Sequence, residues 1–418
     1  MNLKLTSLAS VFGMLLSHSA LTEGVHWVPE SLLPPPPPAG TPLAGYLSVE
    51  QGQAILEAAL KQFPNPESWD AYAKHARQRI QEGAGLSPWP KRTPLNPVVR
   101  NRRTYDGYTV ENVILESVPG HFITGNLYRP LNPTGPCPVF LSTHGHSKGV
   151  KSPEDYDDHA RFAPGMQARC GTLARMGVIV LSLDMFAHGD SIQVFGYAAH
   201  KNPAALTIQL WNAIRAVDYL LSLEGVDPKR VGVSGESGGG TQSFLLTALD
   251  SRVTLSVPVV MVSSYFFGGC FCESALPIHR SADHFVNNAM IAALAAPRPQ
   301  LVISDGKDWT KDVPRVEFPF LQQIYSYYGE EKEISNVHLA DEGHDYGPSK
   351  RAAMITFVGE KFGLDLRLAK DASGAIDESK VTIEHADQLH VFDSKFPIPA
   401  HALHDAKSVA DVIRKLQE

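Results

Sequence analysis

Apolar and polar residues alternate along Tyr108–Glu116 and again along Phe122–Tyr128, on either side of Val118-Pro119-Gly120-His121. Alternation with a period of two predicts two strands, and the Pro-Gly pair predicts the turn that joins them. Ahead of this hairpin, Ser48–Gln81 carries apolar residues three and four positions apart, which predicts helix. The chain is therefore expected to place a helical extension before an antiparallel hairpin.

Short apolar runs then alternate with helical patterns through the middle of the chain. The clearest helix is expected from Asn202-Pro203 to about Leu223, because proline suits a first helical turn and the apolar residues share one face. Such alternation is typical of a mainly parallel α/β sheet covered by helices on both faces. The strands expected are Pro138–Thr143, Val178–Asp184, Val231–Ser234, Val253–Val262, Gln300–Ser304 and Asn336–Ala340.

The 418 residues carry a formal net charge of −7 and no run of Lys or Arg, so the basic surface that nucleic acid or anionic lipid requires is not expected. An apolar stretch follows Lys4 and predicts an export signal, whereas no later stretch is apolar enough to span a bilayer. The organisation expected is a signal peptide (1–20), a proline-rich linker (21–47), a helical extension (48–100), a catalytic domain (101–363) and a C-terminal extension (364–418).

One motif stands out, Gly235-Glu236-Ser237-Gly238-Gly239, directly after the expected strand Val231–Ser234 and directly before a helical pattern. In that context a G-x-S-x-G predicts a nucleophile elbow, where the serine lies on a tight strand-to-helix turn that only small neighbours permit. The N-terminus of the following helix favours developing negative charge. We therefore expect Ser237 to be a nucleophile, although elsewhere the same motif would indicate only a glycine-rich turn.

A serine nucleophile needs an imidazole to take its proton and an acid to orient that imidazole. His344 follows the last expected strand, and Asp308 lies in the loop after the strand Gln300–Ser304, which gives the chain order serine, acid, histidine. Both loops then lie at the carboxyl edge of a parallel sheet. We expect His344 to be the general base and Asp308 the acid.

Two other carboxylates remain candidates for the acid. Asp305 comes straight off its strand and is expected to cap the turn made with Gly306. Glu273 follows the preceding expected strand, Val253–Val262. Glu273 is the alternative acid.

The loop Thr143-His144-Gly145-His146-Ser147 closes another expected strand. Acyl transfer requires two backbone N–H groups aimed at the oxyanion. One is expected from Gly238 and the other from His146, with Ser147 as the neighbouring alternative. His144 and His146 also suggest metal ligands, but no H-E-x-x-H or comparable ligand set accompanies them. A metal site is therefore not expected here.

Four cysteines occur, Cys137, Cys170, Cys270 and Cys272, and the sequence does not choose among the three possible pairings. The Cys-Phe-Cys pair has no second pair at zinc-ligand spacing, so buried thiols or one disulfide are expected. This pair lies in an aromatic insert that begins at Tyr265 and leaves the same sheet edge as Ser237. The insert either lines the substrate pocket or packs on the sheet edge.

Taken together, the hairpin, His144-Gly145, Gly235-Glu236-Ser237-Gly238-Gly239, Asp308 and His344 resemble the α/β-hydrolase superfamily. More narrowly, the chain is similar to bacterial acetyl xylan esterases and dienelactone-hydrolase-like esterases over about residues 108–363. The resemblance implies an eight-stranded, mostly parallel sheet and no cofactor. Ser237 replaces the cysteine nucleophile of dienelactone hydrolases, which argues against that activity.

The expected function is serine-dependent hydrolysis of a carboxylic ester, with an acetylated carbohydrate or another small acyl ester as substrate, by a secreted or periplasmic enzyme. Two alternatives use the same fold. A peptidase of the prolyl oligopeptidase type would need a large β-propeller, and about 85 residues before the hairpin are too few for one. A non-catalytic binding protein would have no reason to keep serine, acid and histidine at the right strand ends.

Overall fold

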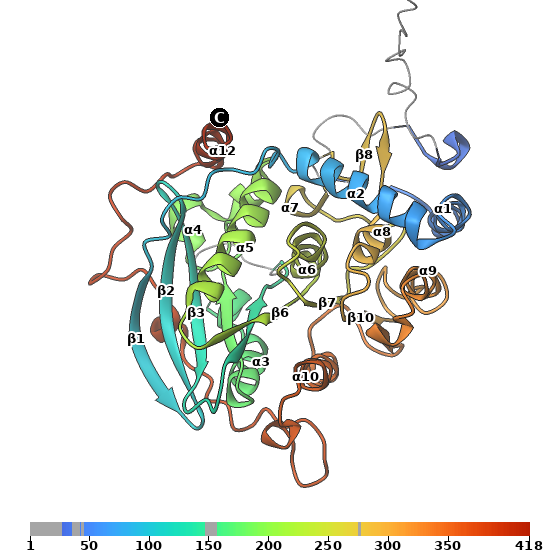
Figure 1. Cartoon of the computed structure of the whole chain (residues 1–418). Helices are drawn as coiled ribbons and strands as arrows, with labels where there is room; N and C mark the ends of the chain where they lie inside the picture. Colours follow the sequence, from blue (N-terminus) through green and yellow to red (C-terminus); the bar gives the residue numbers. More distant parts are fainter. Residues whose placement is uncertain (1–26, 36–41, 43–45, 147–156, 275–276) are drawn as a thin grey trace, which may run out of the picture.

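A twisted central sheet carries the fold in the computed structural model, which describes residues 27–35, 42, 46–146, 157–274 and 277–418 (Figure 1). Its strands lie in the order β1-β2-β3-β5-β4-β6-β7-β10-β11. The pairs from β1 to β5 are antiparallel, and the pairs from β5 to β11 are parallel. The strands are β1 (Val98–Tyr105), β2 (Tyr108–Val118), β3 (His121–Pro130), β4 (Cys137–Ser142), β5 (Ile179–Leu183), β6 (Val226–Glu236), β7 (Leu255–Val259), β10 (Gln300–Asp305) and β11 (Ile334–Leu339).

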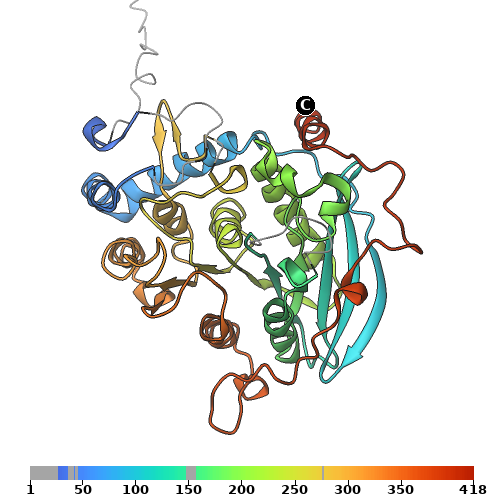
Figure 2. The same ribbon diagram turned by 180° about the vertical axis from the view of Figure 1, so that it is seen from behind.

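Helices cover both faces of this sheet, because successive side chains of each strand point to opposite sides. Val139 and Leu141 of β4 belong to one apolar core, whereas Phe140 between them belongs to the other. Figures 1 and 2 show α3 and α10 on one side and α5, α6 and α8 on the other. The covering helices are α3 (Pro164–Arg175), α5 (Ala205–Ser222), α6 (Gly238–Leu249), α8 (Asn288–Ala293), α9 (Glu317–Ser326) and α10 (Pro348–Phe362).

Smaller elements occupy the connections and the C-terminal segment. They include a two-stranded ribbon and several single turns of helix. They are η1 (Glu30–Leu32), η3 (Ala160–Phe162), α4 (Ser191–Phe195), η4 (Tyr197–Lys201), α7 (Phe271–Ser274), β8 (Arg280–Ser281), β9 (His284–Phe285), η5 (Glu331–Glu333), η6 (Leu366–Ala369), α11 (Ala386–Leu389) and α12 (Ala406–Lys415).

The helical extension consists of two helices, α1 (Val49–Gln62) and α2 (Pro66–Gly83), where the periodicity predicts continuous helix. The break has a local cause. The Asn65 side chain accepts a hydrogen bond from the N–H of Ser68, and Pro66 occupies the first turn, so a new helix begins there. Both helices pack on the α6–α9 side of the sheet.

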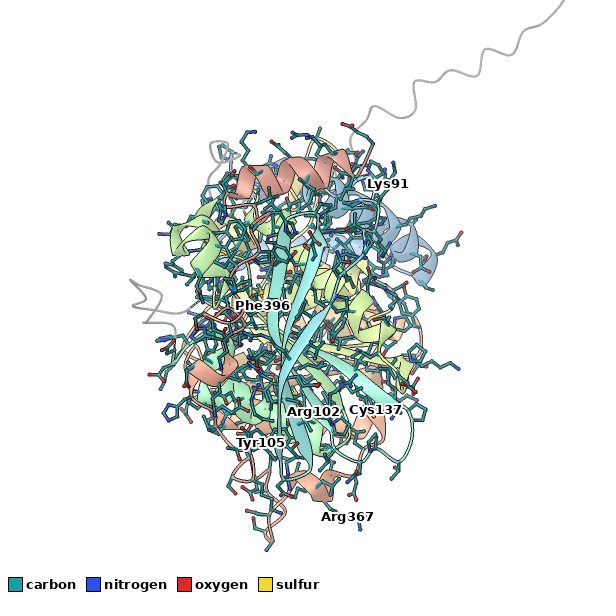
Figure 3. The ribbon with its side chains drawn as sticks, turned by 90° about the vertical axis from the view of Figure 1, so that its left-hand side faces the viewer. Lys91, Arg102, Tyr105, Cys137, Arg367 and Phe396 are labelled. Atoms are coloured by element: carbon teal, nitrogen blue, oxygen red, sulfur yellow. A yellow bond between two sulfur atoms is a disulfide. The ribbon has the colours of Figure 1, made fainter. Side chains whose placement is uncertain are left out.

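The sheet has nine strands in the described part of the chain, so the expectation of eight is wrong. The additional strand is β1, at the antiparallel edge, which carries three arginines and gives no apolar signal. Two of them bind the C-terminal segment: Arg103 pairs with Glu384, and Arg100 donates to the carbonyl of Val391. Figure 3 shows this segment, marked by Phe396, beside the edge strand that carries Arg102 and Tyr105. Tertiary contacts therefore stabilise a strand that its own pattern does not predict.

The C-terminal segment is also tied to the loop after β5. The backbone N–H of Val391 donates to Asp190 Oδ2 at 2.7 Å, and His390 Nδ1 lies 2.5 Å from Asp190 Oδ1. The fully buried Arg161 pairs with Asp190 and with Asp184, and it donates to the carbonyl of Leu389. These contacts hold the segment against the catalytic edge of the sheet.

None of the helices in the described residues has both the length and the apolar character needed to cross a bilayer. The expected signal peptide, residues 1–20, and much of the expected linker lie outside the described residues.

Candidate active site

Ser237 lies between the end of β6 and the start of α6, with φ 54° and ψ −120°. A non-glycine residue in this region of backbone space is held there by its surroundings. The Ser237 N–H donates to the carbonyl of Val259, and its carbonyl accepts from the N–H of Thr241. At Gly235, an added Cβ would lie 2.1 Å from the Thr143 hydroxyl. Small neighbours therefore permit the strained turn.

His344 and Asp308 face each other across the loops that follow β11 and β10. His344 Nδ1 lies 2.6 Å from Asp308 Oδ2, and the other oxygen of Asp308 accepts from the backbone N–H and hydroxyl of Thr310. Asp308 is almost completely buried, while the His344 side chain is partly exposed. Two residues beyond His344, the hydroxyl of Tyr346 hydrogen-bonds Ser234 Oγ at 2.7 Å, which ties the histidine loop to the strand leading to Ser237.

The two other carboxylates have different partners. Asp305 Oδ1 accepts from the backbone N–H of Lys307, and Oδ2 lies 3.5 Å from the ammonium of Lys350. Burial and the nearby charge of Asp308 raise the pKa of Asp305. Glu273 lies 3.4 Å from His146 Nδ1 and accepts from the N–H of Gly269. Burial raises the pKa of Glu273, but these contacts lower it more, so its pKa lies below the ordinary value.

The loop after β4 lies directly against the elbow. An added Cβ on Gly145 would lie 2.9 Å from the Cβ of Ser237, so only glycine allows this approach. Gly238 is the first residue of α6, where backbone N–H groups have no partner within the helix. An added Cβ on Gly238 would lie 3.4 Å from the ring of His146 and 3.1 Å from Glu273 Oε1. Gly238 and His146 are therefore neighbours, whereas Ser147, the alternative donor, lies outside the described residues.

Glu236 and Arg169 support this loop, and sequence reasoning assigned them no role. Glu236 Oε1 accepts from the N–H of Gly145 at 2.9 Å, and its other oxygen lies 3.4 Å from the guanidinium of Arg169. Arg169 also donates to the carbonyl of Thr143 and lies 4.1 Å over the ring of Tyr346. A glutamate inside the glycine-rich motif was the one available signal, since a charged residue there needs a partner.

Four histidines form a cluster at this loop: His144, His146, His188 and His200. The ring centroids of neighbouring members lie 5.3–5.4 Å apart. Burial lowers the pKa of His144 to about 4, so its ring is neutral, and its Nε2 accepts from the N–H of Met185. His146 Nε2 lies 3.1 Å from Cys270 Sγ and 3.0 Å from Cys272 Sγ. His146, His200 and Cys270 lie close enough together to hold a metal ion.

A disulfide joins Cys270 and Cys272, and Cys137 and Cys170 are buried free thiols. The aromatic residues of the insert around this disulfide lie partly beside His344 and partly in the apolar core. Phe266 stacks on Trp309 at 4.0 Å, and Trp309 in turn lies 4.4 Å from the ring of His344. Phe267 instead packs inside the core. Phe266 of the insert therefore packs against Trp309, which itself contacts His344.

Several proteins that resemble this chain are named as esterases. Residues 93–266 match the acetyl xylan esterase (AXE1) family. The solved structure of Methylesterase BT1017 is 39% identical, covers 88% of this chain and 80% of its own, and superposes with a TM-score of 0.80. The 4-O-methyl-glucuronoyl methylesterase of Neurospora crassa is 24% identical over 62% of this chain and 69% of its own length.

More distant solved structures share the fold. A glucuronoyl esterase from Solibacter usitatus is 18% identical, covers 80% of this chain and all of its own, and superposes with a TM-score of 0.51. The expected mostly parallel sheet with helices on both faces is thereby confirmed.

Proposed function

This chain belongs to the acetyl-xylan-esterase-like family of the α/β-hydrolase superfamily and is a carboxylic ester hydrolase, and we propose that its substrate is the methyl ester of a sugar acid. The observation that carries this proposal is the 39% identity over most of Methylesterase BT1017. The name of the Neurospora crassa relative, a glucuronoyl methylesterase, adds support from a second protein.

In the proposed mechanism, Ser237 Oγ attacks the ester carbonyl while His344 takes its proton. The 2.6 Å contact of Asp308 with His344 Nδ1 supports this assignment, since it leaves Nε2 to act as the base. His344 then gives the proton to the departing methanol, and the sugar acid remains on Ser237 as an acyl-enzyme. Water activated by the same imidazole releases the sugar carboxylate.

The negative charge that develops on the carbonyl oxygen requires fixed donors. We assign this role to the backbone N–H groups of Gly238 and His146, which are neighbours at the elbow. The Glu236 carboxylate supports the second donor because it holds the neighbouring N–H of Gly145. One such donor contributes about 10²–10³ in kcat in serine hydrolases.

Methyl esters of sugar acids and acetylated sugars place the carbohydrate on opposite sides of the reacting bond. With a methyl ester, the sugar is the acyl group and becomes attached to Ser237. With an acetylated sugar, only acetyl is transferred. The match of residues 93–266 to acetyl xylan esterases favours deacetylation as the second candidate.

Competing substrates separate these candidates. Methyl glucuronate, methyl galacturonate, acetylated xylose and a dipeptide amide are each assayed at equal concentration, and methanol, acetate and amine release are measured. We expect kcat/KM to be highest for a methyl ester. Preferred acetate release would support deacetylation instead, and preferred amine release would contradict ester hydrolysis as the main activity. The Ser237→Ala variant provides the blank in each assay.

We also propose that the protein is exported and that residues 1–20 are removed as a signal peptide. The apolar stretch after Lys4 supports this proposal. Mass spectrometry of mature protein from the periplasm or medium of a suitable bacterial host should find chains that begin after about residue 20. Recovery of chains that retain Met1 would contradict export by signal cleavage.

A further inference from the structure

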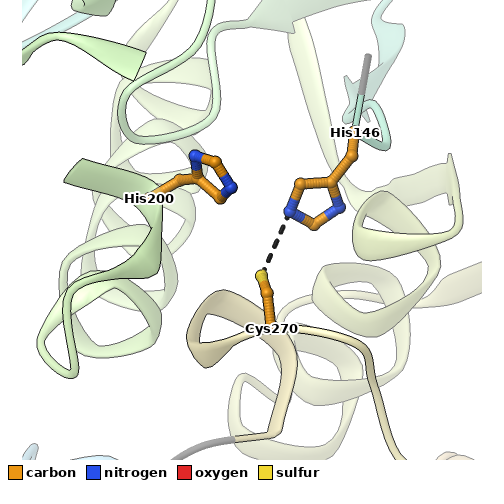
Figure 4. Close-up of side chains that lie close together, drawn as sticks. All are labelled: His146, His200 and Cys270. Atoms are coloured by element: carbon orange, nitrogen blue, oxygen red, sulfur yellow. Dashed lines mark hydrogen bonds between the residues drawn. The ribbon is translucent and has the colours of Figure 1, made fainter. Parts of the chain in front are cut away.

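Beside the oxyanion loop, four side chains converge from three connections at the carboxyl edge of the sheet. His146 follows β4, His200 lies in η4 after β5, and Cys270 and Cys272 lie at the start of α7 after β7. His146 Nε2 is 3.1 Å from Cys270 Sγ and 3.0 Å from Cys272 Sγ. Ligand atoms of His146, His200 and Cys270 all lie within 4.8 Å of one another (Figure 4).

The two imidazoles are held as metal-binding imidazoles usually are. A histidine ligand donates its second ring N–H to a carboxylate or carbonyl, which fixes the ring and its tautomer. His146 places Nδ1 3.4 Å from the buried carboxylate of Glu273, while Nε2 faces the sulfurs. His200 Nδ1 lies 2.5 Å from the carbonyl of Tyr197, which leaves its Nε2 as the ligand atom.

The neighbouring His144 shows the contrast. Its Nδ1 donates to the carbonyl of Gly145, and its Nε2 accepts from the N–H of Met185. Both ring nitrogens are used, so His144 offers no ligand atom. His146 and His200 are therefore chosen as ligands for the orientation of their rings as well as for their proximity to the sulfurs.

Burial and charge also suit a metal ion. His200, Cys272 and Glu273 are each no more than 3% exposed. The Glu273 carboxylate lies beside His146 on the side away from the sulfurs. Two thiolates would balance the charge of a divalent cation.

We propose that reduction of the Cys270–Cys272 disulfide creates a Cys₂His₂ site for Zn²⁺, with His146, His200, Cys270 and Cys272 as ligands. A phosphine and one water reduce the disulfide to two thiols and become the phosphine oxide, and each thiol releases a proton when it binds Zn²⁺. Tetrahedral Zn²⁺ with bonds of about 2.0–2.3 Å separates its ligand atoms by about 3.3–3.8 Å. His146 Nε2 lies 3.0–3.1 Å from the two sulfurs, and the ligand atoms of His146, His200 and Cys270 lie within 4.8 Å of one another.

Four protein ligands leave no open position, which is typical of structural zinc. The ion would anchor His146, and with it the loop whose N–H we assign to the oxyanion. The disulfide joins two residues of one loop, whereas the metal would join all three connections, and the thiol state selects between them. Metal binding itself does not depend on the proposed ester hydrolysis.

The test measures metal on the full-length protein in both thiol states. Protein is reduced with a water-soluble phosphine or left oxidised, loaded with Zn²⁺ or Co²⁺, and passed through gel filtration. We expect about one metal per reduced chain, and at least about ten-fold less on oxidised protein. Reduced protein with Co²⁺ should show the absorption of tetrahedral cobalt and a thiolate charge-transfer band. Less than about a tenth of a metal per reduced chain, or cobalt spectra without the thiolate band, would overturn the proposal.

Variants locate the site. His200→Ala and Cys272→Ser should weaken metal affinity by at least about 10²-fold, and Glu273→Gln by about 10–100-fold, because it removes only the partner of His146. Cys137→Ser and His75→Ala, which lie elsewhere, serve as controls and should bind like wild type. Controls that lose affinity as strongly as His200→Ala would place the metal elsewhere. The comparison of thiol states decides the question even where a ligand variant fails to fold.

Discussion

His344 Nδ1 lies 2.6 Å from Asp308 Oδ2, whereas Glu273, the other candidate acid, lies against His146. Two acid–histidine pairs therefore occupy the same sheet edge with different surroundings. The Asp308 pair lies beside the aromatic wall of Trp309, and the Glu273 pair lies beside the cysteines. This separation of partners makes the acid assignment testable.

Replacement of the three carboxylates should distinguish their roles. Asp308→Asn should lower kcat by about 10²–10⁴-fold, because an amide partner stabilises the wrong tautomer of the catalytic imidazole. Glu273→Gln and Asp305→Asn should lose much less. Steady-state kinetics of the three variants on one methyl ester provide the comparison. A larger loss in Glu273→Gln than in Asp308→Asn would reverse the assignment.

Ser237→Ala should lower kcat by at least about 10³-fold, since members of a catalytic triad act as a unit. The free energy of unfolding should change little, because the variant removes one hydroxyl and leaves the elbow backbone in place. Kinetics and denaturant unfolding measure the two quantities separately. A variant that retained a tenth of wild-type activity would exclude Ser237 as the nucleophile.

Gly145→Ala should lower kcat by about ten- to hundred-fold, because the added methyl would lie 2.9 Å from Ser237 Cβ and displace either the elbow or the oxyanion loop. The matched control is Gly135→Ala, whose added methyl meets no atom within 4 Å. Both variants are assayed on the same ester. Equal activity of the two would show that the close approach at Gly145 has no catalytic importance.

The contact of His390 with Asp190 should make stability depend on pH. Burial lowers the pKa of His390, but the Asp190 carboxylate raises it more, so its folded pKa lies above the ordinary value of about 6.5. A histidine of this kind stabilises the fold fully below its unfolded pKa and loses that contribution as pH rises through the folded value.

The variant His390→Gln isolates this effect. Its deficit in unfolding free energy relative to wild type should be largest below about pH 6.5 and should shrink as pH rises further. Denaturant unfolding of both proteins over a pH series measures the deficit. Asp157, which lies 3.2 Å from His390 Nε2, contributes to the same deficit, because the variant loses its contacts with both carboxylates. A deficit that stayed constant with pH would contradict the charge interaction.

Local pattern determined the sheet and the elbow. Apolar runs predicted β4, β5, β6, β7, β10 and β11. Four of them, β4, β5, β7 and β10, are buried along their whole length, and a strand buried on both faces needs apolar residues at nearly every position. The alternation of apolar strands with helical segments also placed Ser237, Asp308 and His344 directly after strands of one parallel sheet. It therefore predicted that the three residues lie at the same edge of that sheet. Local sequence is sufficient to predict these features because each depends on residues that are close together in the chain.

Tertiary structure decided what depends on partners distant in the chain. The arginine-rich β1 forms because Glu384 and Val391 of the C-terminal segment satisfy Arg103 and Arg100. The choice of Asp308 over Glu273 as the partner of His344 depends on how three loops turn after leaving the sheet. The cluster of His146, His200 and the two cysteines likewise has no spaced motif, since its members come from separate connections. Their approach results from strand order, which side-chain pattern along one segment does not encode.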